Sequence, residues 1–257
     1  LLGGSGRVLV LKVVGAFGGF LFSLLVARRF GDDALGRAEL FVLAITVGGT
    51  LLRWGAEGAV VKLFSGWSSR GQYARVAQRF RNWSWPMLGV AVAIACVGWL
   101  FPMDFYLVRL NGGLGIAIGA WVLIGWSGEA LRGTGRVGWY ALLQPGWWML
   151  LAGIVMVLFG LRPLFALSMT ALFLASGGMA GALRLFAQHA SSSPSIYQNS
   201  AMEDRRALTR LAGPIWLGSM LHLMLSWADT AFIAVWLTES DVAHYRAAFR
   251  LAALLTF

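Results

Sequence analysis

The sequence predicts an all-α integral membrane protein, built as a polytopic helix bundle. Of its 257 residues, 58% are hydrophobic and only 12% are charged, and the mean hydropathy is +0.71. Soluble domains carry about 25% charged residues, so about half of the usual solvating surface is missing. The apolar residues also gather in runs of roughly 20, the length that a helix needs to cross a bilayer. The 13 tryptophans and 33 glycines fit this class, because Trp favours bilayer interfaces and Gly is common in membrane helices.

Seven segments are predicted to span the bilayer, and an eighth begins near residue 242. The seven are 8–28, 37–61, 83–101, 113–131, 137–160, 163–186 and 209–237. Pro86, Pro102 and Pro163 are expected near helix ends. Pro145 and Pro214 fall inside the fifth and seventh spans, which we expect them to kink or delimit.

Positive charge is unequal on the two sides of this predicted bundle. The side that carries the amino terminus holds 13 Lys and Arg residues. The opposite side holds five, namely Arg28, Arg29, Arg37, Arg109 and Arg162. Because Lys and Arg gather in cytoplasmic loops, we expect a multi-pass protein of the cytoplasmic (inner) membrane with its amino terminus inside. The net charge of +10 then reflects topology, and the expected partner is the lipid bilayer and no nucleic acid.

The longest polar stretch predicts a division into two units. We expect residues 1–187 to form a first six-helix bundle, 188–207 a cytoplasmic linker, and 208–257 the start of a second bundle. The first apolar segment lacks a cleavage site, which indicates a retained helix. The last apolar run stops at Phe257, so we expect a piece of a longer protein. With Cys96 as the one cysteine, neither an intrachain disulfide nor a thiolate metal cluster is expected.

Two acidic turns interrupt the apolar runs in the same way. "RRFGDDALGRAEL" (28–40) and "WLTESDVAHYRAAF" (236–249) each follow a long span and precede a helix. They are related by an offset of 207 residues, which covers six helices and the linker. An even number of helices returns the chain to the same side, so the two halves are predicted to be parallel repeats. Both turns should lie on the outer face, with their acids at the amino-terminal ends of the next helices, where negative charge is favourable.

These segments also resemble a family of membrane transporters. "LLVARRFGDDALGRAEL" (24–40) and "LAGPIWLGSMLHLMLSWADTAFIAVWLTESDVAHYRAAFRLAALL" (211–255), joined by a basic linker, are similar to polysaccharide exporters of the O-antigen flippase type. That family lies within the multidrug/oligosaccharidyl-lipid/polysaccharide exporter superfamily. One departure is Ala243, which stands where the first turn has Gly36.

The resemblance implies a flippase of twelve or more helices. Such a protein would move an undecaprenyl-pyrophosphate-linked oligosaccharide from the inner to the outer leaflet by alternating access. Its partners would be the lipid-linked oligosaccharide and proteins that polymerise or assemble the polysaccharide. The chain has no Walker A sequence, so H⁺ or Na⁺ is the expected coupling ion, and no cofactor is expected.

Charged residues inside spans are costly and therefore candidates for function. Arg53 and Glu57 lie one turn apart in the second predicted span. They are either a mutually neutralising structural pair or a substrate-binding site, in which Arg53 would bind a pyrophosphate or an acidic sugar. Glu129 and Arg132 are expected to pair at the inner end of the fourth span.

A second candidate site lies in the seventh span. Asp229 is expected either to couple transport to an ion or to serve as a partner for Arg246 or Arg250 on the next helix. His222, seven residues earlier and on nearly the same face, could relay a proton, or could simply be hydrogen-bonded.

Three alternatives to the flippase stay open at this stage. A cation-coupled multidrug exporter would share the superfamily and the fold. A membrane glycosyltransferase that uses a polyprenyl-phosphate sugar would place its acidic pair at Asp32 and Asp33, but the loop there is only about six residues long, too short for the broad shelf that such catalysis needs. The third is a purely structural membrane subunit. We expect a protein that is not an enzyme.

Overall fold

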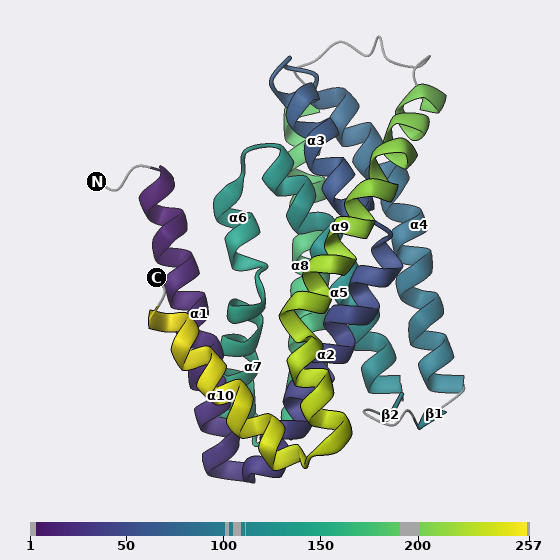
Figure 1. Ribbon diagram of the computed structural model, residues 1–257. Coiled ribbons are helices and arrows are strands. Elements are labelled where there is room, and N and C mark those ends of the chain that lie inside the picture. The colour runs from purple at the N-terminus through teal and green to yellow at the C-terminus, as the bar shows by residue number, and fades with distance from the viewer. Residues whose placement is uncertain (1–3, 101–102, 105–108, 111, 191–200, 256–257) are drawn as a thin grey trace.

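The computed structural model describes residues 4–100, 103–104, 109–110, 112–190 and 201–255, and within these ranges the fold is a bundle of helices (Figure 1). Its elements are α1 (Gly4–Phe30), α2 (Asp32–Arg53), α3 (Ala56–Ser68), α4 (Tyr73–Leu100), β1 (Met103–Asp104), β2 (Arg109–Leu110), α5 (Gly112–Gly133), α6 (Val137–Leu142), α7 (Pro145–Phe159), α8 (Pro163–Ala190), α9 (Ala201–Trp236) and α10 (Glu239–Leu255). The two short strands pair antiparallel. In the described part of the chain, six helices are long and apolar enough to cross a membrane. The prediction of an all-α, multi-pass helix bundle is confirmed.

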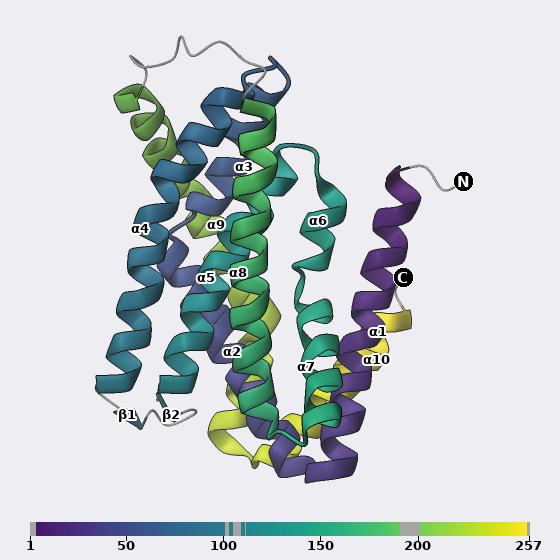
Figure 2. The ribbon, with the colours of Figure 1, turned by 180° about the vertical axis from the view of Figure 1, so that it is seen from behind.

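The helices run alternately up and down between two ends of the molecule (Figures 1 and 2). One end, which we call the turn end, holds the α1–α2 turn, the α9–α10 turn and the two short strands. The other, the linker end, holds the α3–α4 and α5–α6 turns and the ends of α8 and α9 that face residues 191–200. Those ten residues, half of the predicted linker, lie outside the described residues.

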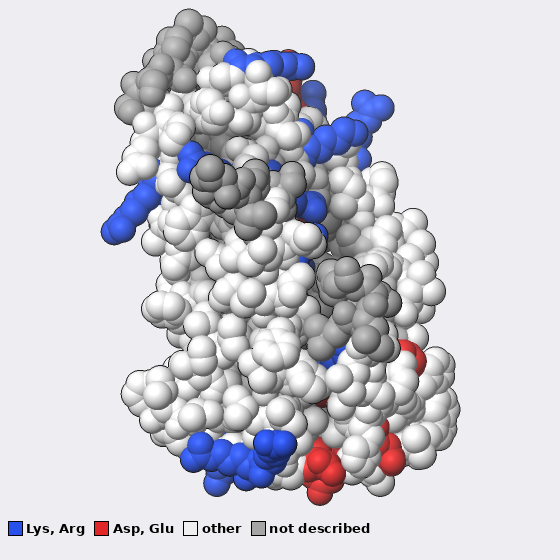
Figure 3. All heavy atoms as spheres, turned by 90° about the vertical axis from the view of Figure 1, so that its left-hand side faces the viewer, with Lys and Arg blue, Asp and Glu red and all other residues white. Residues whose placement is uncertain are grey.

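Charged side chains follow this division (Figure 3). On the face shown, most of the middle of the molecule carries neither acid nor base. Acidic side chains gather toward the turn end and basic ones near both ends. Such a band is the surface that a bilayer would cover.

The prediction of one continuous helix over 37–61 is wrong. α2 ends at Arg53, and α3 starts at Ala56 after a break formed by Trp54 and Gly55. Both residues have a left-handed backbone, with φ of 47° and 72°. Only glycine adopts that conformation without cost, and Gly55 has a second reason to be glycine. A Cβ there would lie 2.2 Å from the carbonyl oxygen of Ala212, because α9 packs directly on the break.

The predicted fifth span, 137–160, is also two helices. α6 ends at Leu142 and α7 begins at Pro145, so this proline delimits a helix. Proline suits the first turn of a helix because its missing N–H would be unpaired there. α8 likewise begins at Pro163, as expected, and Pro214 lies inside α9. The expectation that Pro86 lies near a helix end is wrong, since α4 starts thirteen residues earlier, at Tyr73.

α4 and α9 extend well beyond their apolar runs because their polar first turns pack on each other. Asp204 of α9 is 3% exposed, and it accepts hydrogen bonds from Arg75 and Arg79 of α4. The distance from the Nε of Arg79 to the carboxylate oxygen is 2.7 Å. A hydropathy window cannot find a helical turn whose burial depends on ion pairs.

The core of the bundle is built around α5, the most buried of the candidate spans. Its indole rings pack inward, Trp121 against Trp148 of α7 and Trp126 against Phe80 of α4, with ring centroids 5.1 Å and 6.1 Å apart. Trp126 is fully buried and donates its indole N–H to the hydroxyl of Ser84, at 2.9 Å. The rigid centre is therefore formed by α4, α5, α7 and α8, and α9 and α10 pack on its α1–α3 side.

Candidate functional site

The two acidic turns lie against each other at the turn end. As predicted, Asp32 and Asp33 occupy the first turn of α2, and Glu239 and Asp241 the first turn of α10. The backbone N–H and the hydroxyl of Thr238 donate to Asp241 at 2.9 Å and 2.6 Å. These hydrogen bonds hold the pKa of that exposed carboxyl below its usual range.

The contact between the turns explains why the first turn has Gly36 where the second has Ala243. A Cβ on Gly36 would lie 1.9 Å from the carbonyl oxygen of Glu239, so only glycine permits this approach of α2 to α10. Ala243, the corresponding residue of the second turn, has room for its methyl group in the core. The first turn needs glycine because the backbone of Glu239 lies directly against Gly36, whereas no such approach excludes a methyl group at Ala243.

Ion pairs connect the turns reciprocally. Asp32 lies 3.3 Å from the Nε2 of His244, and Arg37 lies 3.4 Å from Glu239. Under the 207-residue offset, Asp32 corresponds to Glu239 and Arg37 to His244. The two ion pairs are therefore equivalent: exchanging each residue for its counterpart turns one pair into the other. Two hairpins, α1–α2 and α9–α10, would make such contacts if a two-fold axis related them. All four side chains are more than 40% exposed, so the pairs define register more than they add stability.

A buried group of charges lies deeper between the same helices, and we call Glu39, Arg246 and Arg250 the Glu39 cluster. Glu39 is 1% exposed and accepts from the Nη2 of Arg250 at 2.8 Å and 2.9 Å. The Nε of Arg246 lies 3.5 Å from the same carboxylate. The guanidinium of Arg246 also stacks over Trp227, 4.0 Å from the ring centroid.

The cluster also reaches α1. Nη1 of Arg250 donates to the carbonyl oxygen of Gly19 at 2.8 Å and to the hydroxyl of Ser23. One carboxylate thus holds two arginines of α10 against α1 and α2. Removing one member would leave buried charge unpaired, which is strongly destabilising.

Asp229 lies beside this cluster and has a different partner from those expected. Its carboxylate accepts from the hydroxyl of Tyr245 and, at 2.7 Å, from the backbone N–H of Thr230. The arginines proposed as its partners, Arg246 and Arg250, pair with Glu39 instead. Asp229 therefore keeps a carboxylate near the α9–α10 interface without a direct salt bridge in the described structure.

A polar cavity separates α2 and α3 from α9, with a volume of about 520 Å³. Its polar lining comprises Thr46, Thr50, Glu57, Ser219, His222 and Ser226. A second cavity of about 290 Å³ shares Thr46 and Trp227 with the first, and it is lined by Arg246 and Arg250. The two adjacent cavities together extend from the broken α2–α3 span to the Glu39 cluster.

The structure brings two predicted site residues, Glu57 and His222, to the same cavity from different halves of the chain. The ring of His222 forms no hydrogen bond within the described residues, so its nitrogens are open to the cavity. Arg53 lies elsewhere. It is 7% exposed and contacts Glu57, but its Nη1 donates to the carbonyl oxygen of Trp121 at 3.0 Å and its Nη2 to Thr50 at 3.3 Å. The two terminal nitrogens that would bind phosphate are occupied by Trp121 of α5 and Thr50 of α2, which favours the structural pair.

Sequence reasoning missed Glu39, the most buried acid of the site. It was treated as part of the acidic turn, although it lies a full two turns inside α2. The 207-residue offset contained the signal, because Glu39 corresponds to Arg246, a residue of opposite charge. The smaller pair, Glu129 and Arg132, was expected and is confirmed at 2.6 Å.

Comparison of the chain with models of protein families, with curated proteins and with solved structures found no match. What the protein does must therefore be inferred from its own residues and geometry.

Proposed function

We propose that this protein is a membrane transporter that flips a polyprenyl-pyrophosphate-linked oligosaccharide across the cytoplasmic membrane for surface polysaccharide biosynthesis, by ion-coupled alternating access. The turn end would face outward and the linker end the cytoplasm, as the distribution of Lys and Arg predicts. The substrate class rests on the resemblance of residues 24–40 and 211–255 to polysaccharide exporters. Proteins that polymerise or assemble the polysaccharide would act on its product.

The observation that carries the proposal is the polar cavity beside a broken span. Transporters place substrate and ion sites at discontinuous helices between repeats, where irregular backbone can line a cavity. Here the break at Trp54–Gly55, the carboxylate of Glu57 and the ring of His222 meet between the two halves. Hydroxyl groups and an acid suit the hydroxyl-rich surface of a sugar.

Alternating access also needs a closure that can open and close at the turn end, and we assign that closure to the Glu39 cluster. It fastens α10 to α1 and α2, so the hairpins cannot separate at the turn end while it is intact. Protonation of Glu39, or of Asp229 beside it, would weaken this closure. Moving one charge through a potential of 100 mV supplies about 2.3 kcal/mol, enough to shift such an equilibrium appreciably. We assign ion coupling to these two carboxylates, and a proton relay to His222.

A cation-coupled multidrug exporter is the second candidate within the same fold. It would need an apolar, acidic cavity for an organic cation, and Glu57 is consistent with that. Of the two arginines that line the adjoining cavity, Arg250 is occupied by Gly19, Ser23 and Glu39, and Arg246 is the one that favours an anionic substrate such as a pyrophosphate.

Transport by the full-length protein in proteoliposomes tests the proposal. A fluorescent polyprenyl-pyrophosphate oligosaccharide is incorporated, and its head group is quenched from outside with and without a proton or sodium gradient. Gradient-dependent movement of the head group supports the flippase. Efflux of ethidium without movement of the glycolipid would support the multidrug exporter, and a change in the mass of the glycolipid would support the enzyme.

Gly218 gives a matched variant for this assay. It lines the 520 Å³ cavity, and a Cβ there meets no atom within 4 Å, so the side chain of Gly218→Leu starts from open space and takes up part of the cavity. Gly89 of α4 is equally open and remote from the cavity. Gly218→Leu should abolish flipping and Gly89→Leu should not, and both should keep the wild-type melting temperature.

A further inference from the structure

A third cavity, with a different lining, lies on the far side of α5. It is a groove of about 570 Å³ between α6, α7 and α8. The groove exists because the span is broken at Leu143–Gln144 and because α8 presents glycines there. Of these, Gly177 and Gly181 are fully open, since a Cβ on either would meet no atom within 4 Å.

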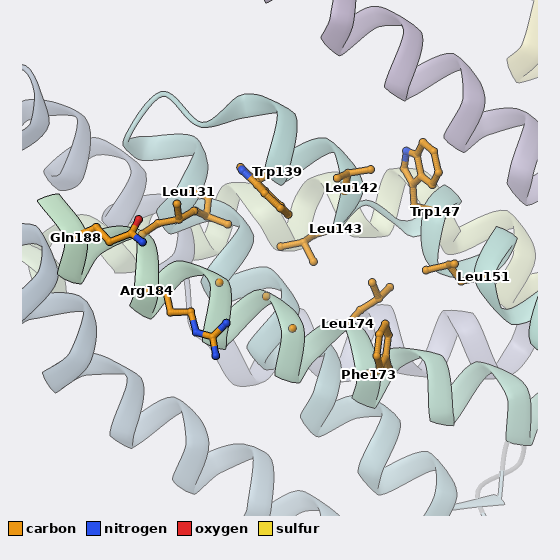
Figure 4. A pocket seen from close by; sticks show the side chains of 14 residues that line it. Leu131, Trp139, Leu142, Leu143, Trp147, Leu151, Phe173, Leu174, Arg184 and Gln188 are labelled. Carbon is orange, nitrogen blue, oxygen red and sulfur yellow. The ribbon is translucent and has the colours of Figure 1, made fainter.

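The lining of this groove is apolar along nearly its whole length. Trp139 and Phe173 remain 56% and 72% exposed, so both rings are accessible to the apolar part of a lipid. The two polar residues of the lining, Arg184 and Gln188, lie together at one end (Figure 4). Leu151 and Phe173 lie at the other. The groove is thus amphipathic from end to end, like a lipid.

Its length corresponds to one leaflet of a bilayer. From Arg184 to Phe173, α8 makes eleven steps, or about 16 Å at 1.5 Å per residue. Half of the hydrocarbon core measures about 15 Å. A single acyl chain would therefore cover the apolar part, with its head group at the linker end.

The polar end carries positive charge that the described protein does not neutralise. Arg184 forms no ion pair or hydrogen bond in the part of the chain that the structure describes. Arg136, at the start of α6, bonds to the ring of His189 at 3.0 Å and 3.2 Å, a partner that carries no negative charge. Arg132, by contrast, is paired with Glu129. The head group that suits this end is an anion, and an arginine fork binds phosphate oxygens bidentately.

We propose that this groove binds an anionic phospholipid of the leaflet at the linker end, with one acyl chain along Gly177 and Gly181 and the phosphate on Arg184. The lipid would fill the gap that the broken α6–α7 span leaves beside α8. This site is separate from the cavity assigned to transport, and lipid binding is measured without any transport step, so either proposal can fail alone.

Native mass spectrometry of the delipidated full-length protein tests the site. The protein is titrated with dioleoyl phosphatidylglycerol and with dioleoyl phosphatidylcholine, which share their chains and differ in net charge. Wild type should bind the first lipid about fivefold more tightly, the effect of roughly one interfacial charge. Arg184→Gln should reduce that binding to the level of phosphatidylcholine. Arg81→Gln, which removes an exposed charge from α4, should not change it.

A second pair of variants tests the acyl-chain part. Gly181→Leu fills the groove and should weaken binding of both lipids about tenfold, because displaced methylenes lose about 0.8 kcal/mol each. Gly89→Leu adds the same side chain to α4 and should change nothing. If Gly181→Leu is poorly folded by its melting temperature, Gly177→Leu replaces it.

Three results would overturn the proposal. They are equal binding of both phospholipids by wild type, unchanged phosphatidylglycerol binding in a folded Gly181→Leu or Gly177→Leu variant, and displacement of phosphatidylglycerol by an equimolar polyprenyl phosphate. The last result would assign the groove to a carrier lipid.

Discussion

The carboxylate of Glu39 in α2 lies 3.5 Å from the Nε of Arg246 in α10, which stands 207 residues later in the chain, at the offset that relates the two acidic turns. A contact between equivalent positions lies on the axis that relates two repeats. Under the same 207-residue offset, the positions of the pair Asp32–His244 correspond to those of the pair Glu239–Arg37. The two acidic turns therefore form the two sides of one contact at the turn end.

Exchange of the central charges should restore much of what single reversals remove. Glu39→Arg leaves three arginines together and Arg246→Glu leaves two acids, and breaking a buried pair costs about 3–5 kcal/mol. The double variant Glu39→Arg/Arg246→Glu restores opposite charges. Melting temperatures of the three proteins in one detergent check this. Losses in the double variant equal to the sum of the two single losses would show that the residues do not interact.

Arg53→Lys should lower expression and transport in equal proportion. The lysine keeps the charge beside Glu57, but it cannot also donate to the carbonyl of Trp121 and to Thr50. The amount of folded protein and the flipping rate per folded molecule are measured separately. A variant that folds normally and has lost transport would return Arg53 to the substrate site.

Asp229→Asn should insert and fold normally but lose gradient-dependent export. Asparagine has the same size, can still accept from the N–H of Thr230 through its Oδ1, and can donate from its Nδ2 to the hydroxyl of Tyr245, so the change removes the titratable charge and keeps both contacts. Substrate binding should survive. Export at the wild-type rate with unchanged pH and Na⁺ dependence would reduce Asp229 to a structural acceptor for α10.

The linker between the units should be accessible from the cytoplasm. A cysteine at Ser192, in a background where Cys96 is alanine, should react with an impermeant maleimide only in inside-out vesicles. A cysteine at Asp33 should react only in intact cells, where it serves as the control. Labelling of the Ser192→Cys site from outside would invert the topology.

Hydropathy and charge predicted most of the fold, because apolar runs of the right length have few alternatives in a bilayer. Pro163 and the acidic first turns of α2 and α10 also located helix starts correctly. The break of the second span at Gly55, which has a left-handed backbone, was not predicted, because one glycine barely changes the mean hydropathy of a window of residues.

The site was harder to predict than the fold for a related reason. Asp229 and His222 were identified as unusual charges within an apolar run, but their partners depend on packing between distant segments. Glu39 and Asp204 lie next to polar turns, so their burial is evident only once α10 and α4 are in place. Spacing along one helix cannot supply a contact that joins residues about two hundred positions apart.

We propose that the α1–α2 and α9–α10 hairpins move apart at the turn end during transport. Asp33→Cys and Ser240→Cys, at corresponding positions of the two turns, allow spin labels to report their separation by pulsed electron resonance in proteoliposomes, with Cys96 replaced by alanine. We expect a short distance at rest and a second, longer distance under an ion gradient with substrate, and the Glu39→Gln variant should populate the longer distance without either. A single short distance that persists while the glycolipid is being flipped would contradict the proposal.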